Sequence, residues 1–86
     1  MPTTGANTVT IINYVFTPTT LNITVGTKVT WINTDAVEHT ATSDLGLFDG
    51  DLPANGGSYS FTFTSAGLYT YHCSLHTYMT GQIVVR

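Results

Sequence analysis

The sequence predicts an all-β domain built as a two-sheet β-sandwich or barrel. Apolar and polar residues alternate with a period of two along several short segments, which is the pattern of half-buried strands. Glycine, proline, asparagine and aspartate separate these segments and mark turns. Threonine is the commonest residue, and β-branched side chains favour strands, whereas no segment has a helical pattern.

The predicted strands are short and end at turn residues. Pro18 bends the chain after the first strand, and Gly26 permits a tight turn after the second. Residues 44–57 are predicted as a loop, because glycine, proline, aspartate and asparagine interrupt every pattern there. The predicted strands are 8–16, 21–25, 28–33, 38–43, 59–64, 68–73 and 81–85. Short strands at this spacing favour antiparallel pairing in two packed sheets.

One face of each predicted strand supplies the core. Side chains two positions apart point to the same side of a strand, so apolar residues at this spacing share a face. The predicted core residues are Ile11, Leu21, Ile23, Val25, Val29, Trp31, Phe61, Phe63, Tyr69, Tyr71, Ile83 and Val85.

Length and composition limit the functions that the chain can have. Its 86 residues suffice for one domain, predicted over 8–86 and preceded by a flexible N-terminal segment over 1–7. The net charge is −3 and only Lys28 and Arg86 are positive, so we expect no binding of nucleic acid. No segment approaches the ~20 apolar residues of a membrane span, so we expect no direct insertion into a membrane.

The segment YHCSLHTYMT, residues 71–80, contains the single cysteine and most of the other side chains that bind soft metals. Cys73 shares the inward face of its strand with Tyr71, whereas His72 points the other way. A buried cysteine often serves only as a small apolar side chain. The histidine three residues later and the methionine six residues later favour a metal ligand instead, and His72 is predicted not to bind the metal.

His76 and Met79 follow Cys73 at intervals of three residues within one loop. A loop that folds back can direct a thiolate, an imidazole and a thioether to one point, and this set suits copper. The remaining histidine, His39, lies on a polar strand that can neighbour this loop in a sandwich. We therefore predict a mononuclear blue-copper site, one ion per chain, with Cys73, His39 and His76 in a trigonal plane and Met79 as the weak axial ligand.

Three enzymatic interpretations are weaker. Cys73 and His76 resemble a nucleophile and its base, but no third group that would orient the base is evident. A hydrolytic zinc site at Glu38 and His39 is disfavoured because adjacent strand residues point to opposite faces. An acid–base pair of Asp49 and Asp51 would lie in a glycine-rich turn, where solvated carboxylates are more common. We expect that the protein is not an enzyme.

These residues resemble the cupredoxin family of small blue copper proteins. The closing segment GLYTYHCSLHTYMTG, residues 67–81, is similar to the family's cysteine-containing ligand loop, and VGTKVTWINTDAVEHT, residues 25–40, is similar to its other ligand segment. Two residues separate Cys73 from His76, and two separate His76 from Met79, which is the short, amicyanin-like arrangement. The resemblance covers the chain from about residue 8 onward.

The resemblance implies a Greek-key sandwich of about eight strands, one copper ion near one end, and transfer of single electrons between redox partners. It also implies a periplasmic, cell-surface or extracellular location, although no export signal occurs in this chain. We further expect a monomer. The family usually has asparagine after the first histidine, where this chain has Thr40, and the hydroxyl of Thr40 is predicted to meet Ser74 instead.

Partner docking is predicted at an apolar patch near His76. His76 is expected to be the more exposed of the two ligand histidines and the route by which electrons leave the metal. The residues expected to form this patch are Leu45, Leu47, Phe48, Leu75 and Tyr78. Two other functions remain open at the level of sequence. The chain could carry or buffer copper without a redox role, or it could be a cupredoxin domain cut from a larger membrane-anchored or multicopper protein.

Overall fold

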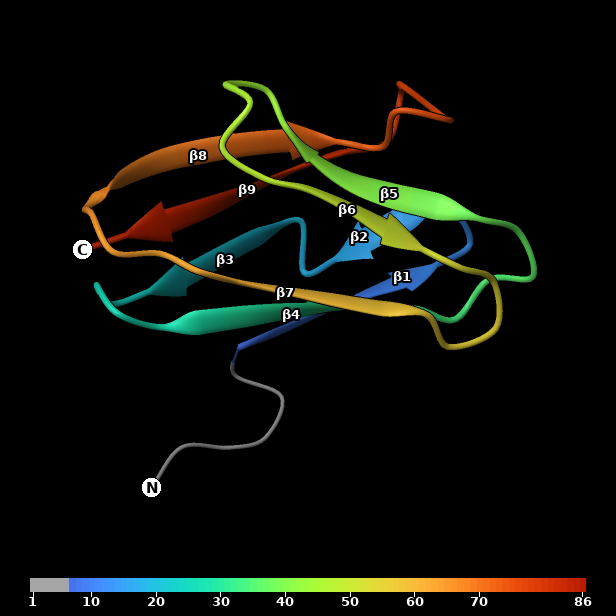
Figure 1. Cartoon of the computed structure of the whole chain (residues 1–86), viewed down its shortest axis with the longest axis horizontal. Helices are drawn as coiled ribbons and strands as arrows, with labels where there is room; N and C mark the ends of the chain where they lie inside the picture. Colours follow the sequence, from blue (N-terminus) through green and yellow to red (C-terminus); the bar gives the residue numbers. More distant parts are fainter. Residues whose placement is uncertain (1–6) are drawn as a thin grey trace.

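The computed structural model describes residues 7–86, in which nine strands form two β-sheets around a common core (Figure 1). The first sheet contains, in spatial order, β2 (Val15–Thr17), β1 (Thr8–Ile12), β4 (Lys28–Asn33) and β7 (Ser58–Thr62). The second contains β3 (Thr20–Ile23), β9 (Thr80–Val85), β8 (Gly67–His72), β5 (His39–Ser43) and β6 (Asp49–Leu52). The all-β, two-sheet prediction is confirmed.

Two predicted boundaries are wrong. The segment 8–16 forms two strands, because Asn13 and Tyr14 adopt positive φ angles of 51° and 64° and turn β2 back onto β1. The segment 44–57, predicted as a loop, contains β6, which pairs with β5. In β6 the sequence Asp-Gly-Asp-Leu has a glycine at one of its two buried positions, so the apolar alternation that would indicate a strand is missing.

The expectation of antiparallel pairing holds for most strand pairs but not for all. β1 runs parallel to β4, and β3 runs parallel to β9, whereas the other strand pairs are antiparallel. Neither parallel pair joins strands that are consecutive in the chain, which changes sheets between β2 and β3 and again between β3 and β4. The alternation within one strand contains no information about the direction of its neighbour, so the sequence pattern could not reveal these pairs.

The core lies between the sheets and agrees with most of the sequence prediction. Val25 is the exception at 48% exposed, because β3 ends at Ile23 and Val25 belongs to the following turn. Phe61 and Tyr69 are only partly buried but pack against the core. The predicted residues that are buried are Ile11, Leu21, Ile23, Val29, Trp31, Phe63, Tyr71, Ile83 and Val85. Besides the predicted ligands Cys73 and Met79, the buried apolar residues that the core prediction omitted are Val9, Phe16, Ala41, Phe48 and Leu52.

The N-terminal prediction falls largely on residues 1–6, outside the described residues. Asn7 is described, and its carbonyl accepts a hydrogen bond from the Thr30 N–H at 3.0 Å. Among residues 7–86 no helix is long and apolar enough to cross a membrane.

The end of β8 is fixed by close packing around Tyr71. Its ring is fully buried and meets the Trp31 ring edge-on, with 5.4 Å between ring centroids. Its cross-strand partner is Gly81, where a Cβ atom would lie 2.5 Å from the phenol oxygen. The glycine therefore leaves the space that the phenol occupies, two residues before Cys73. The phenol makes no hydrogen bond within the described part of the chain, and burial raises the pKa of Tyr71 to about 12.

This pKa predicts a loss of stability at alkaline pH. The phenol of an unfolded tyrosine ionises near pH 10, whereas the buried one resists ionisation until about pH 12, so the unfolded state gains from ionisation first. The free energy of unfolding should therefore fall between pH 10 and pH 12 by up to about 3 kcal/mol on account of Tyr71. Urea unfolding of the metal-free Tyr71→Phe protein should show a correspondingly smaller fall. Tyr78→Phe, at a side chain 72% exposed, is the control; an equal effect of both changes would contradict the assignment.

Candidate metal centre

The predicted ligands come together at one end of the sandwich. The turn between β1 and β2, the segment before β5 and the loop between β8 and β9 all lie at the right-hand end in Figure 1. His39 is the first residue of β5, and Cys73 directly follows β8. Because β5 and β8 are paired through Thr42 and His72, residues that are distant in sequence lie side by side at this end.

Three of the four predicted ligands form a close cluster. The donor atoms of His39, Cys73 and His76 all lie within 4.8 Å of one another. The Sγ atom of Cys73 is 3.7 Å from Nδ1 of His39 and 3.8 Å from Nδ1 of His76. His39 and Cys73 are fully buried, whereas His76 is partly exposed. Each imidazole thus turns its Nδ1 toward the sulfur.

The chemistry of this donor set fits copper. One thiolate and two imidazoles that surround a single point form the His₂Cys arrangement of blue-copper sites, and the soft sulfur favours Cu(I) as well as Cu(II). The donors also need deprotonation before they can bind, so a proton competes with the metal at each of them. The residues present therefore fit one copper ion, which His39, Cys73 and His76 would hold.

Met79 closes the loop that contains these ligands. Its N–H donates to the carbonyl of His76 at 2.9 Å, and its own carbonyl accepts from the Cys73 N–H at 3.1 Å. The side chain is 2% exposed and belongs to the buried cluster. These hydrogen bonds fold the loop back on itself, as the sequence analysis expected. The assignment of the Met79 thioether as the axial ligand stays a prediction.

Thr40 joins the two ligand segments. Its hydroxyl accepts a hydrogen bond from the Ser74 N–H at 2.8 Å and donates to the Ser74 hydroxyl at 3.1 Å. The N–H of Thr40 donates to the Cys73 Sγ at 3.4 Å, a contact that stabilises negative charge on the sulfur. The predicted contact between Thr40 and Ser74 is confirmed.

The segment that leads into His39 is organised by a buried asparagine that the sequence analysis did not identify. Asn33 is fully buried, and its Nδ2 donates to the carbonyls of Val37 at 2.8 Å and Leu52 at 2.9 Å. Its Oδ1 accepts from the Asp35 N–H at 2.9 Å. A buried amide with its hydrogen bonds satisfied fixes the path of the chain around it. Asn33 thereby sets the position of the turn before His39.

Asp35 was also missed, and its carboxylate contacts His39 directly. Oδ2 of Asp35 lies 2.9 Å from Nε2 of His39, and the carboxylate also accepts from the N–H groups of Asn13 at 2.8 Å and Tyr14 at 2.9 Å. Burial acts to raise the pKa of Asp35, but the hydrogen bonds from Tyr14, His39 and Asn13 together outweigh it and lower the pKa. An acidic residue four positions before a ligand histidine was the available signal in the sequence.

Tyr14 packs against both His39 and His76. Its ring meets the His39 and His76 rings edge-on, with 5.0 Å between centroids in both cases. The two imidazoles are themselves 5.0 Å apart, centroid to centroid. Tyr14 is 37% exposed, so one side of its ring faces solvent while the other limits access of water to the site.

The other titratable candidates lie outside this cluster. His72 points away from the core, as its position in the strand predicts, and its Nδ1 pairs with the carboxylate of Asp44. A hydrogen bond from the Thr70 side chain, followed by the contact with His72, lowers the pKa of Asp44. Glu38 is exposed and is not part of the ligand group, consistent with the weak zinc interpretation.

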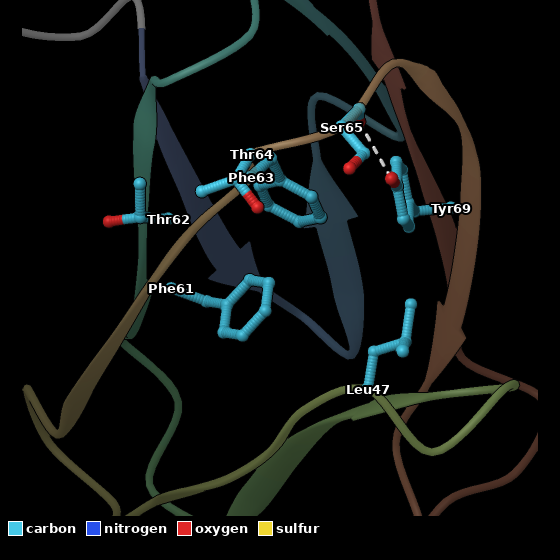
Figure 2. A pocket seen from close by; sticks show the side chains of 7 residues that line it. All are labelled: Leu47, Phe61, Thr62, Phe63, Thr64, Ser65 and Tyr69. Carbon is cyan, nitrogen blue, oxygen red and sulfur yellow. Dashed lines mark hydrogen bonds between the residues drawn. The ribbon is translucent and has the colours of Figure 1, made fainter.

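The predicted docking patch is partly wrong. Phe48 is a core residue, 4% exposed, and cannot contribute to a surface patch. Leu47 faces Phe61 and Tyr69 around a pocket that also includes Thr62 to Ser65, away from the ligand cluster (Figure 2). His39 is at the first end of β5, whereas Leu47 and Phe48 come after its other end. Their closeness to His39 in the sequence therefore does not place them near it in space. Leu75 and Tyr78 lie on the ligand loop and are 54% and 72% exposed.

Residues 3–86 match the sequence model of a family described as copper binding proteins, plastocyanin/azurin family. The chain belongs to this family. The match includes both ligand segments and extends over almost the whole chain, so it agrees with the donor chemistry of the cluster.

Individual relatives and solved structures agree. The chain is 37% identical to amicyanin from Paracoccus denitrificans over 86 residues, covering 94% of this chain and 66% of that protein. It is 35% identical to a chloroplastic plastocyanin from Tetradesmus obliquus over 85 residues, covering 84% of this chain and 59% of that protein. The chain thus spans less than two thirds of the length of these two relatives.

The fold is shared with solved cupredoxins. An oxidised methionine-to-leucine variant of amicyanin superimposes with a TM-score of 0.87 at 34% identity, covering 99% of this chain and 86% of that chain. A purple cupredoxin from Nitrosopumilus maritimus gives a TM-score of 0.86 at 33% identity, covering 92% of this chain and 98% of that chain. The cupredoxin fold predicted from the sequence is therefore confirmed, with nine strands among the described residues in place of about eight.

Removal of the Thr40 hydroxyl should measurably lower the free energy of unfolding. In Thr40→Val the Ser74 N–H loses its acceptor in a partly buried position, and such a loss costs about 1–3 kcal/mol. Thermal and urea unfolding of the metal-free protein should show a decrease of this size. Thr40→Ser, which keeps the hydroxyl, is the matched control and should retain most of the stability. Equal stability of the valine and serine variants would show that the hydroxyl is not what joins the two segments.

Proposed function

We propose that this cupredoxin is a mononuclear blue-copper electron-transfer protein, with copper held by His39, Cys73, His76 and Met79. The observation that supports this function most strongly is the preassembled cluster, in which three donor atoms lie within 4.8 Å of one another. Copper, when bound, supplies a one-electron couple between Cu(II) and Cu(I). The protein supplies a fixed donor set whose geometry suits both oxidation states.

The rigidity of the site supports electron transfer over copper storage. His39 and Cys73 are fully buried, and the Thr40 contacts join their segments, so these donors have little freedom to move when the charge on the metal changes. A small rearrangement favours fast electron transfer. A carrier that hands copper to other proteins needs donors that exchange readily, and two donors closed to solvent do not meet that need.

We propose that redox partners dock at the end of the molecule where His76 reaches the surface. Leu75 and Tyr78 flank His76 on the loop, the Tyr78 ring lies 6.2 Å from the His76 ring between centroids, and both side chains are more than half exposed. A small apolar surface suits the brief contacts of redox proteins. We further propose that the protein acts as a monomer on the periplasmic or cell-surface side, as the resemblance to cupredoxins implies.

The ligand assignment predicts specific spectral losses. Addition of Cu(II) should produce an intense absorption band toward the red end of the visible spectrum, because a copper–thiolate bond absorbs there. Cys73→Ser should abolish the band. Since loss of an outer hydrogen-bond partner already costs 10–100-fold in metal affinity, His39→Ala should weaken Cu(II) binding by at least about a hundredfold. His72→Ala, one residue from Cys73 but outside the cluster, is the matched control and should leave the band unchanged.

The axial position has its own test. Met79→Leu should keep the absorption band, because the thiolate remains, and should change the reduction potential, because the axial ligand tunes it. Cyclic voltammetry of the copper-loaded variant measures the shift. An unchanged potential together with unchanged copper affinity would remove Met79 from the ligand set while leaving the other three ligands in place.

The docking surface predicts slower electron exchange when it becomes charged. Self-exchange between oxidised and reduced copies, measured by NMR line broadening, uses the protein as its own partner. The double change Leu75→Asp and Tyr78→Asp should slow it by about tenfold or more, because charge repulsion and desolvation oppose contact through this face. Leu68→Asp is the control, since Leu68 is 58% exposed on β8 near its far end. Equal slowing by both variants would place the exchange surface elsewhere.

A further inference from the structure

The carboxylate of Asp35 accepts hydrogen bonds from three groups at the metal end of the molecule. Oδ2 contacts Nε2 of His39 at 2.9 Å, Oδ1 accepts from the Asn13 N–H at 2.8 Å, and Oδ2 also accepts from the Tyr14 N–H at 2.9 Å. The Asp35 side chain is only 12% exposed and His39 is fully buried. The contact with His39 is therefore partly shielded from water, which makes such an interaction stronger, whereas the hydrogen bonds from Asn13 and Tyr14 lie at the surface.

The contact with His39 determines which ring nitrogen carries the proton. An ionised carboxylate can only accept hydrogen bonds, so Nε2 of His39 must be the donor. The lone pair of the neutral ring is then on Nδ1, which lies 3.7 Å from the Cys73 Sγ and belongs to the ligand cluster. Asp35 thus holds His39 in the tautomer that metal binding requires.

The negative charge of Asp35 also changes the basicity of the His39 ring. A carboxylate that accepts the second N–H of a ligand histidine raises the basicity of the ligating nitrogen. A more basic ligand and a nearby negative charge both stabilise the more highly charged ion, Cu(II), relative to Cu(I). The expected result is a lower reduction potential and tighter binding of Cu(II).

The same carboxylate positions the ring that covers the site. Asn13 and Tyr14 both have positive φ angles, a conformation that is unfavourable for residues other than glycine, and both donate their N–H groups to Asp35. The Tyr14 ring then meets both ligand histidines at 5.0 Å. Asp35 therefore connects the turn between β1 and β2 to the metal site.

We propose that Asp35 is a positioning residue that fixes the tautomer of His39 and lowers the reduction potential of the bound copper. This proposal rests on the proposed function only for its effect on the potential. The tautomer of His39 and the anchoring of Tyr14 are properties of the metal-free protein and can be tested without copper.

Asp35→Asn tests the effect of the charge, because asparagine has nearly the same shape and keeps an oxygen acceptor. The ratio of Cu(II) to Cu(I) affinity should fall about tenfold, which for a one-electron couple is a rise in reduction potential of about 59 mV. Cyclic voltammetry and competition titrations with a Cu(II) chelator and a Cu(I) chelator measure the potential and the two affinities independently. An unchanged potential would overturn the proposal.

Asp44→Asn is the matched control. Asp44 also pairs its carboxylate with an imidazole, but with His72, which is outside the ligand cluster. The Asp44→Asn substitution removes the same charge from the molecule and should shift the reduction potential much less than Asp35→Asn. Equal shifts would show that only the net charge matters, and the assigned role of Asp35 would then be wrong.

A measurement on the unaltered protein covers the case in which Asp35→Asn does not fold. Nitrogen-15 NMR of the metal-free protein at neutral pH should show His39 protonated at Nε2, with a proton that exchanges slowly with water. Protonation at Nδ1 alone, or fast exchange at Nε2, would overturn the proposal. If the protein failed to give a copper–thiolate band, the proposed function would fail, while this NMR result would still decide the role of Asp35 in orienting His39.

Discussion

The proposed copper site depends on a short pairing between two strands that are distant in sequence. β5 and β8 share the residue pairs Thr42–His72 and Ser43–Tyr71, and beyond Thr42 the ladder ends. There the Thr40 N–H donates to the Cys73 sulfur in place of a backbone carbonyl, and the Thr40 hydroxyl binds the backbone of the ligand loop. The site is therefore formed where regular pairing stops and side-chain hydrogen bonds continue the connection between the strands.

This arrangement explains how a small core can hold a cluster of metal donors. Cys73 lies fully buried, two residues after Tyr71, whose ring is held by Trp31 and by the space at Gly81. His39 is equally buried, but both of its ring nitrogens face polar atoms, one the sulfur and the other Asp35. The cost of placing polar groups in the interior is thus offset by specific partners, which also fix their orientation.

Much of the proposed donor cluster could be predicted from the sequence, because its residues follow simple local rules. The alternation in a strand placed Cys73 inward and His72 outward, and the spacing of His76 and Met79 indicated a folded ligand loop. Features that depend on distant segments were not predictable in this way. The parallel pairing of β1 with β4, the strand at Asp49–Leu52 and the burial of Phe48 all depend on which neighbours the chain meets in space. The spacing of Asp35 to His39 was visible in the sequence, but two of the three donors to Asp35 come from the turn between β1 and β2, which only the fold brings close.

The unequal burial of the two histidines has a consequence for how the protein acquires its metal. His39 and Cys73 are closed to solvent, whereas His76 is partly exposed on the loop between β8 and β9. The His76 side, next to Tyr14, is therefore the more open approach for an incoming ion. If redox partners dock at the end where His76 reaches the surface, as proposed, a protein that delivers copper would compete with them for the same face.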